Sequence, residues 1–321
     1  MERLSQFVEE PMHKLYWTSV KTMLECPQRY LWSKGHPDHD LGAGPGKPKP
    51  LPPEEERNSE HNLLMGSVLS KVVEYVYNHE LWKDPQTLLS NAERIAKEEF
   101  LDLESKHYCL WSYMTREDAL NVCLEGARNF IRIMKDNRLL GPWNQSEFRM
   151  TPTLNNHVSV CGIADLIFRD KNGDIHILDG KNAQTPGKYE DPDQLRWYAL
   201  AFKLQYGVLP KRLAFFYFRY PSTKPPKDYD PASWTGMHEV TLTEDDVSRL
   251  TQTAIEVSKN IHFGKFQANP QPKHCGGCPY EKVCEERVSQ RARNAAKRGI
   301  VKKAPIQDPT SGVDGFGTLK L

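Results

Sequence analysis

The sequence predicts an α/β fold, because its hydrophobic pattern changes from helical to strand-like and then alternates between the two. Apolar residues recur at helical spacing between residues 61 and 139. Two β-prone runs follow within 157–183, and helix, strand and helix patterns then succeed one another up to about residue 262. With 321 residues, 38% of them hydrophobic, the chain can bury a substantial core.

The amino-terminal part is expected to be helical. Residues 16–33 are expected to form a helix that Pro27 kinks or restarts, because proline lacks the N–H group that a helix interior needs. Residues 35–60 are expected to form a flexible loop, since six prolines, four glycines and a charge run leave little to bury. Leu64 and Val68 then share one face of a helical pattern. Helices are expected at 61–79, 86–106 and 115–139.

The clearest hairpin in the sequence joins residues 157–168 to residues 174–183. Both runs are apolar and β-prone, and Asp-Lys-Asn-Gly at 170–173 is a turn signal. Thr243 is expected to cap a later helix, because three acidic residues follow it in what would be the first turn. The elements expected after the hairpin are a helix at 191–206, a strand at 211–220, a loop at 221–232 and a helix ending near residue 262.

Bulk charge and hydropathy exclude few functions. The net charge is +1, from 43 basic and 42 acidic residues, so it does not indicate a nucleic-acid partner. Residues 287–303 carry seven Lys or Arg and no acid, which fits either a solvated tail or a segment that contacts phosphates. No apolar run reaches the roughly 18 residues of a membrane span, and the acidic start does not resemble a secretory signal. A cytoplasmic location is expected.

Two aspartates are expected to face each other across the hairpin. Pairing the strands outward from the turn places Asp165 opposite Asp179, where directly opposed side chains lie roughly 4.5–5.5 Å apart at Cβ. Two carboxylates that close repel each other unless a cation lies between them, and oxygen ligands favour Mg²⁺ or Mn²⁺. Lys181 points to the same face as Asp179 and can hold a phosphate or orient a water. The alternative interpretation is a surface salt bridge.

The helix after the hairpin brings two further polar groups to one face. Gln194 and Tyr198 are four residues apart, so they lie one turn above each other. An amide and a phenol beside the aspartates could contact a phosphate or orient Lys181. By itself the pair is a weak signal, which an ordinary amphipathic helix explains in most cases.

Three short motifs follow one another from the hairpin into this helix: Gly162-x-x-Asp165, Asp179-x-Lys181 and Gln194-x-x-x-Tyr198. In this order they resemble the RecB-type nuclease domain of the P-D-(D/E)-x-K superfamily, and are similar to the CRISPR-associated exonucleases of the Cas-four kind. The resemblance implies a restriction-endonuclease-like core, with a mixed central sheet flanked by helices. It also implies a metal-dependent DNA exonuclease, with single-stranded ends as its expected substrate.

The resemblance assigns roles to individual residues. Glu147 matches, less closely, an acid that often precedes the hairpin in this family. The other implied roles are metal binding by Asp165, Asp179 and the Gly180 carbonyl, catalysis by Lys181, and support of the site and the DNA by Gln194 and Tyr198.

One position departs from the family pattern. The early helix of the family commonly carries Gly-x-x-x-His, whose histidine joins the metal shell, whereas Gly66 is followed here by Ser70. Serine is a poor metal ligand, so the alternative hypothesis is a module of the same fold that binds DNA or a protein without cutting. His61, His107 and His157 are expected to be ordinary surface histidines.

The cysteines divide into a terminal set and a scattered set. Cys275, Cys278 and Cys284 supply three thiolates within ten residues, one short of a closed four-ligand site. In the same family a distant Cys-Pro cysteine completes the set, and Cys26 precedes Pro27. The implied cofactor is a [4Fe–4S] cluster that clasps the two ends of the domain. Zinc, with His274 as a further conceivable ligand, and free thiols are the alternatives.

The remaining cysteines, Cys109, Cys123 and Cys161, are expected to be small buried apolar residues. No nucleotide motif accompanies the terminal cysteines, which argues against an iron–sulfur redox protein and means that a helicase or CRISPR or recombination partner would be a separate chain. The expected organisation is a helical segment with the first cluster cysteine (1–34), a flexible loop (35–60), a nuclease core with a helical insertion (61–270), a cysteine segment (271–290) and a disordered basic tail (291–321).

Overall fold

The computed structural model describes the chain in two compact units. The described residues are 13–34, 59–106, 109–111, 114–142, 144–187, 190–227, 229–281 and 284–286. The first unit extends to Gln267 and the second begins at Ala268. Residues 35–58, most of the predicted loop, and the predicted basic tail lie outside the described residues. The predicted domain boundaries stay predictions.

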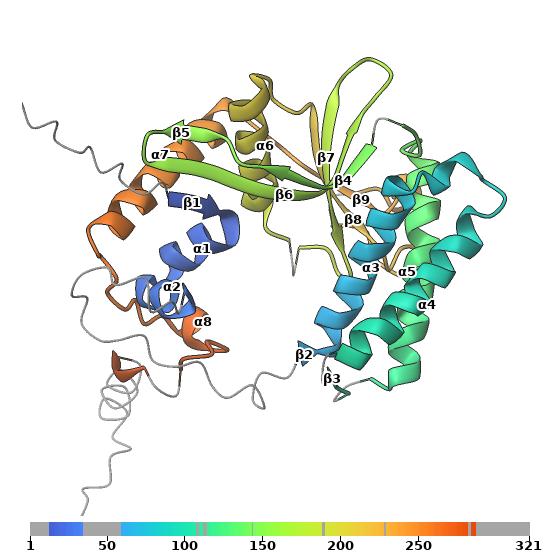
Figure 1. Ribbon diagram of the computed structural model, residues 1–321, viewed down its shortest axis with the longest axis horizontal. Helices are drawn as coiled ribbons and strands as arrows, with labels where there is room; N and C mark the ends of the chain where they lie inside the picture. Colours follow the sequence, from blue (N-terminus) through green and yellow to red (C-terminus); the bar gives the residue numbers. More distant parts are fainter. Residues whose placement is uncertain are drawn as a thin grey trace, which may run out of the picture. The chain divides into compact units, whose positions relative to one another are not determined.

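The first unit is built on a mixed sheet, whose hydrogen-bonded order is β1-β6-β7-β8-β9, with β4 and β5 also paired to β6 (Figure 1). The β1–β6 and β7–β8 pairs are parallel, and the remaining pairs of this sheet are antiparallel. A second sheet pairs β2 with β3. The strands are β1 (His13–Tyr16), β2 (Ser59–Glu60), β3 (Cys109–Leu110), β4 (Asn144–Met150), β5 (Thr153–Asn155), β6 (Val158–Arg169), β7 (Ile175–Lys181), β8 (Arg212–Tyr217) and β9 (Met237–Val240).

The predicted helices are present within a few residues of their expected ends. The predicted effect of Pro27 takes the form of a restart, because one helix ends at Glu25 and the next begins at the proline itself. The helices are α1 (Trp17–Glu25), α2 (Pro27–Lys34), α3 (His61–Asn78), α4 (Leu88–Lys106), α5 (Arg116–Asp136), α6 (Pro192–Tyr206), α7 (Glu244–His262) and, in the second unit, α8 (Pro272–Cys275), with 3-10 turns at Leu81–Lys83 and Pro231–Ser233.

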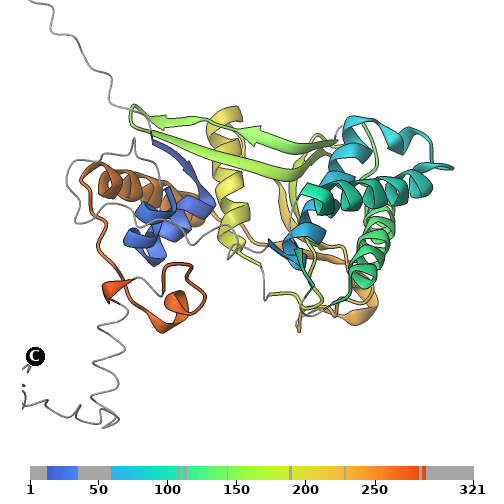
Figure 2. The same ribbon diagram turned by 60° about the horizontal axis from the view of Figure 1, so that its bottom comes forward.

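Helices cover both faces of the sheet. Two hydrophobic cores result: α3, α4 and α5 form one with the sheet, and α1, α6 and α7 form the other. Figures 1 and 2 show these two groups of helices at opposite ends of the sheet. Strand β6 contributes to both cores, with Leu166 in the first and Ile167 in the second, as successive residues of a strand point to opposite faces. The predicted α/β class, with a mixed central sheet flanked by helices, is confirmed.

Local signals explain where several elements begin and turn. Thr243 and Asp246 form a capping box at the start of α7, as the acidic first turn predicted. Gly173 has a φ of 86°, a left-handed conformation that glycine adopts without a steric penalty, and it closes the hairpin turn. Among the described residues, no helix is both long and apolar enough to cross a membrane.

Candidate active site

The candidate site lies where β6 and β7 separate. Their antiparallel register runs from Arg169–Ile175 to Leu166–Leu178 and ends there. Asp165 and Asp179 are the next residues on the two strands, so continuing the register places them opposite each other, as the hairpin pattern predicted. The Gly180 N–H donates to Asp165 Oδ2 at 2.8 Å. The Asp165 carboxylate therefore lies in the fork, the place where β6 and β7 separate. It accepts the hydrogen bond that a main-chain carbonyl of the neighbouring strand would accept in a continuous ladder.

Asp179 is the most deeply buried acid of the site, with 2% of its surface exposed. Its Oδ2 lies 2.5 Å from the Lys181 Nζ, which also lies over the Phe215 ring at 5.1 Å from the ring centroid. The two charges form a close ion pair, yet Oδ2 accepts no hydrogen bond of regular geometry from the described residues. A buried carboxylate oxygen with an unsatisfied lone pair is suited to a further cationic ligand.

Burial makes ionisation of the Asp165 and Asp179 carboxyl groups unfavourable. Burial and the neighbouring charge of Asp179 raise the pKa of Asp165 well above its usual range, although the Gly180 N–H and Lys181 oppose the shift. Burial also raises the pKa of Asp179, against the lowering effect of Lys181. A divalent cation between the carboxylates would reverse both effects by favouring their charged forms. The residues present therefore fit the predicted Mg²⁺ or Mn²⁺.

Glu147 adds a third acid to the same row. The β4–β6 register pairs Ser146 with Leu166 and Phe148 with Ala164, which places Glu147 opposite Asp165. Its φ of 49° is left-handed, a conformation that a residue with a long side chain rarely adopts and that often marks a functional position. Burial and the charge of Glu74 raise the pKa of the Glu147 carboxyl. Continuing the two registers thus places Glu147, Asp165 and Asp179 in one row across β4, β6 and β7, which we call the acid row.

The described residues contain no group of three or more His, Cys, Asp and Glu side chains that converges as a complete metal site. The predicted shell has only two carboxylates, Asp165 and Asp179, with the Gly180 carbonyl and waters. Such a shell is the open kind that Mg²⁺ uses, because this ion keeps several of its waters.

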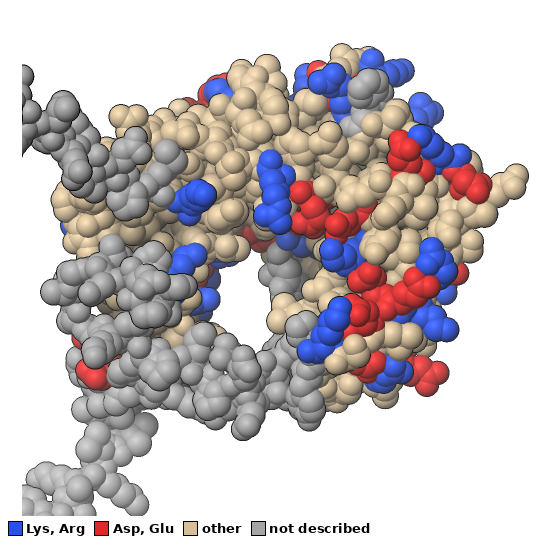
Figure 3. Space-filling view, in the orientation of Figure 1, with Lys and Arg blue, Asp and Glu red and all other residues tan. Residues whose placement is uncertain are grey.

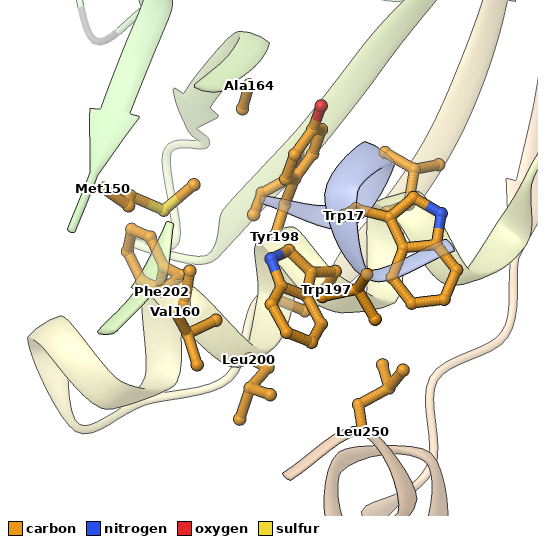
Figure 4. Close-up of a cluster of buried hydrophobic side chains, with 14 of the residues drawn as sticks. Trp17, Met150, Val160, Ala164, Trp197, Tyr198, Leu200, Phe202 and Leu250 are labelled. Carbon is orange, nitrogen blue, oxygen red and sulfur yellow. The ribbon is translucent and has the colours of Figure 1, made fainter. Parts of the chain in front are cut away.

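Helix α6 brings Gln194 and Tyr198 to this place, as predicted. The Gln194 Nε2 donates to the Tyr198 phenol oxygen at 2.8 Å. In Figure 4 this oxygen points away from Trp197 and from the core below it. Burial, followed by the charges of Asp179 and the other acids, raises the pKa of Tyr198, so the phenol lies within their field.

Gly162 allows α6 to approach the sheet closely. A Cβ added at Gly162 would lie 2.8 Å from the Tyr198 Cδ1. The glycine of the first motif therefore makes room for the tyrosine of the third, which is a packing reason for both. The three motifs meet at one place in the structure.

A polar groove of about 730 Å³ lies beside Glu147, between α3 and β4. Gly66 and Ser70, the two residues of the departure from the family pattern, line it on α3. Figure 3 shows acidic side chains with basic ones on either side in this region. Arg149 lines the β4 side of the groove. Its side chain is exposed and makes no hydrogen bond or ion pair with a described residue. Lys71, also in the wall, pairs with Glu74 at 2.6 Å.

Two residues of the groove wall, Arg149 and Lys71, were not predicted from the sequence. Arg149 follows Glu147 by two residues on a strand that the pattern did not indicate, so no signal marked it. Lys71 follows Ser70 directly and looks like any exposed lysine of an amphipathic helix. Their common position becomes visible only when α3 and β4 are brought together.

The histidine prediction is partly wrong. His61 is buried, with 4% of its surface exposed, because it begins α3 against the core rather than on the surface. His157 is exposed, as predicted, and His107 lies outside the described residues. Neither the buried His61 nor the exposed His157 is given a metal role.

The scattered cysteines behave mostly as predicted. Cys123 and Cys161 are fully buried, and burial raises the pKa of the Cys123 thiol to about 12, so it is a poor nucleophile and ligand. Cys109 is only half-buried, because it lies on the short strand β3 rather than in the sheet of the core, and this corrects its predicted burial.

The terminal cysteines lie in different units. Cys26 follows α1 in the first unit, and Cys275, Cys278 and Cys284 are in the second, all half-buried. The Cys278 N–H donates to the Cys275 carbonyl at 3.1 Å, so these two residues share one tight turn, with Gly277 in a left-handed conformation. A turn of this kind is compatible with two thiolates on one metal centre. The four-cysteine cluster stays a prediction.

Comparison with known proteins gives one family match. The PD-(D/E)XK nuclease superfamily model matches residues 17–285. No curated protein matches the chain. Among solved structures, the crystal structure of SSO0001 is similar at 14% sequence identity, over 80% of this chain and 95% of that one. Its TM-score of 0.29 is too low to support the fold assignment. Because the family match covers well over half of the 321-residue chain, with the three motifs and the terminal cysteines inside it, this chain belongs to the PD-(D/E)XK nuclease superfamily.

Proposed function

We propose that this chain is a metal-dependent nuclease that hydrolyses phosphodiester bonds in DNA. Membership of the superfamily supports a phosphodiester hydrolase in general. The observation that carries the proposal is the pair of opposed carboxylates at the β6–β7 fork, with the Lys181 ammonium 2.5 Å from Asp179. Such a charge arrangement is costly for stability alone and is suited to binding a cation and a phosphate together.

Asp165, Asp179 and the Gly180 carbonyl would hold Mg²⁺ or Mn²⁺. A bound ion of this kind supplies Lewis-acid chemistry for phosphodiester hydrolysis. The Gly180 N–H fixes the Asp165 carboxylate, so its free oxygen keeps one orientation. Burial keeps competing water away from Asp179.

Lys181 would donate to a non-bridging oxygen of the scissile phosphate and stabilise the charge that develops there. Water adds to phosphorus, the bond to the leaving oxygen breaks, and that oxygen takes up a proton. Tyr198, held by Gln194, would steady the lysine and the phosphate from the α6 side.

The motif resemblance favours exonuclease activity, with single-stranded DNA ends as the substrate. The polar groove beside Glu147 supports it, because an open wall of small and polar side chains on α3 leaves space for a strand next to the acids.

Cys26, Cys275, Cys278 and Cys284 are proposed to hold a [4Fe–4S] cluster of structural role, with zinc as the alternative metal. Three cysteines within ten residues of the sequence and the Cys275–Cys278 turn support a metal centre there. A separate helicase or CRISPR or recombination partner, and a cytoplasmic location, stay predictions.

The test is degradation of end-labelled single-stranded and duplex DNA by anaerobically purified protein, with Mg²⁺, Mn²⁺ or EDTA. Asp179→Asn is expected to abolish cutting, and Lys181→Ala to slow it by about 100-fold or more, the scale of losing one charged donor to the transition state. Asp136→Asn, at an exposed position of α5, is the matched control and is expected to cut at the wild-type rate.

The second candidate function is DNA binding without cleavage, which Ser70 in place of the usual histidine favours. Folded protein that binds DNA but cuts it under none of these conditions would establish the binding module instead. Cutting that survives in Asp179→Asn would remove the assignment of the fork as the active site.

A further inference from the structure

A second cavity, of about 450 Å³, lies at the turn end of the β6–β7 hairpin. We call it the basic pocket, because Arg138, Arg169, Lys171 and Arg212 line it and Asp170 is its one acid among the described lining residues. Figure 3 shows Lys and Arg side chains gathered over the tip of this hairpin. The pocket is on the turn end of the strands whose other part carries Asp165 and Asp179.

The acid of the basic pocket is already engaged. The backbone N–H groups of Asn172 and Asp174 donate to Asp170 Oδ1 at 2.8 and 3.0 Å. The His176 Nε2 lies 3.2 Å from Asp170 Oδ2. Asp170 is thus held in the turn by hydrogen bonds, and its single negative charge is outnumbered by the four basic side chains that line the pocket.

Several basic groups of the pocket are available to a ligand. The side chains of Arg138 and Lys171 are exposed and make no hydrogen bond or ion pair with a described residue. Arg212 pairs with Glu239 at 2.8 Å through one terminal nitrogen, but its Nε is buried without a hydrogen-bond partner, as is the His176 Nδ1. Unpaired cations and buried nitrogens without partners in the wall of one cavity fit a polyanion with several oxygen acceptors.

The basic pocket and the acid row share strand β4, although Phe168 and His176 of the pocket point to the opposite face of the hairpin from Asp165 and Asp179. Asn144, the first residue of β4, lines the pocket, and Glu147 lies three residues further along the same strand, about 10 Å at ~3.4 Å per residue. Ser146 lies between them and bonds to Asn78 at 3.1 Å. Strand β4 pairs only with β6, so its other edge carries no strand of the described sheet. A nucleic acid along β4 would reach both places.

We propose that the basic pocket binds a backbone phosphate of the nucleic acid at a point about 10 Å along β4 from the acid row. The identity of this ligand rests on the proposed function, whereas the anion preference rests on the pocket alone. The contact would anchor the strand without taking part in cleavage, and would make binding depend on the length of the substrate.

The experiment measures binding of a fluorescent single-stranded 20-mer by anisotropy at several salt concentrations. The protein carries Asp179→Asn, so that the DNA is not degraded. Adding Arg138→Glu with Lys171→Glu is expected to weaken binding at least 10-fold. It should also reduce the slope of log affinity against log salt by about 1 to 2, because each lost phosphate contact removes a released counterion.

The control carries Lys97→Glu with Lys259→Glu, which changes net charge by the same amount at two exposed lysines that make no side-chain hydrogen bond or ion pair with a described residue. An equal loss in the control would show a general charge effect and overturn the pocket, as would unchanged binding in the pocket variant. Thermal midpoints of all variants show whether they are folded.

Two further measurements distinguish DNA from a free anion as the ligand, and failure of the pocket proposal from failure of the proposed nuclease. Calorimetric titration with inorganic phosphate that detects binding lost in the pocket variant, with DNA binding unchanged, would assign the pocket to a free anion and overturn the proposal. In wild-type background, the pocket variant is expected to lose cutting of a 20-mer while keeping cutting of a dinucleotide, which is too short to span the ~10 Å between the acid row and the pocket. Absence of cutting by wild-type protein, together with the changed salt slope, would reject the proposed nuclease and leave the nucleic-acid contact standing.

Discussion

At the scale of single residues, the site contains two buried carboxyl groups whose charges Lys181 and the Gly180 N–H compensate only in part. Asp165 and Asp179 each have a raised pKa because they are buried, and Asp179 adds repulsion to Asp165. A raised carboxyl pKa favours the neutral form in the folded state. Stability from these groups is therefore complete below the unfolded pKa and is lost as the pH rises through the folded pKa. At neutral pH without metal, the acid pair destabilises the fold.

Removing one charge should therefore stabilise the metal-free protein. Asp165→Asn keeps an oxygen that can accept the Gly180 N–H and relieves Asp179, which retains Lys181. We expect the variant to melt a few degrees above wild type at pH 7 in EDTA, corresponding to about 1–2 kcal/mol at ~2–4 °C per kcal/mol for a chain of this size. The difference should shrink toward pH 4, where the wild-type aspartates bind protons.

Magnesium supplies the second half of this prediction. Mg²⁺ should raise the melting temperature of wild type but not that of Asp165→Asn, because a ligand stabilises only the state that binds it. The Asp136→Asn protein should follow wild type in both buffers. Equal melting temperatures for wild type and Asp165→Asn without metal would show that the two carboxylates do not repel each other in the fold.

At the scale of elements, helix α3 forms one wall of the polar groove, and the small residues Gly66, Ser67 and Ser70 leave space in the middle of this wall. A Cβ added at Gly66 would meet nothing within 4 Å, so a larger side chain there points into open space. Gly66→Phe should fill the groove without disturbing the core, and losing a helical glycine favours the helix by up to about 1 kcal/mol.

We expect Gly66→Phe to reduce DNA cutting at least 10-fold while hydrolysis of the small diester bis(4-nitrophenyl) phosphate is retained. Gly66→Ala adds only the Cβ and should cut DNA like wild type. Equal loss of both substrates would mean that the change reaches the acids, and unchanged DNA cutting would mean that the strand does not pass over α3.

The same elements show what the sequence could and could not predict. Helix α7 was predictable because Thr243 and its acidic turn form a local cap, and β6 and β7 were predictable because their apolar runs flank a strong turn signal. Strand β4 was missed: its residues are mostly half-buried and polar, and the left-handed φ of Glu147 interrupts its pattern. The motif residues could be named from spacing, but the groove depends on contact between α3 and β4, which are 66 residues or more apart in sequence.

At the scale of the whole molecule, the proposed cluster would connect residues about 250 positions apart. Cys26 belongs to the unit that ends at Gln267, whereas its three proposed partners belong to the next. Closing so long a loop restricts the unfolded chain by several kcal/mol in the chain-entropy model, about 4.7 kcal/mol for a loop of 100 residues in the case of a disulfide. A metal centre that closes this loop is therefore expected to raise the free energy of unfolding of the chain.

Cys26→Ser tests this connection, because three cysteines within one short segment leave the fourth position open. We expect the anaerobically purified variant to lose most of its iron, inorganic sulfide and visible absorption, and to become sensitive to proteolysis near residue 268. Cys109→Ser, at a half-buried thiol outside the proposed set, should keep the wild-type iron content. Full iron retention in Cys26→Ser would exclude this cysteine as a ligand, and one zinc per chain without iron would identify the alternative metal. Because neither result requires DNA cleavage, the cluster can be accepted or rejected whatever the fate of the nuclease.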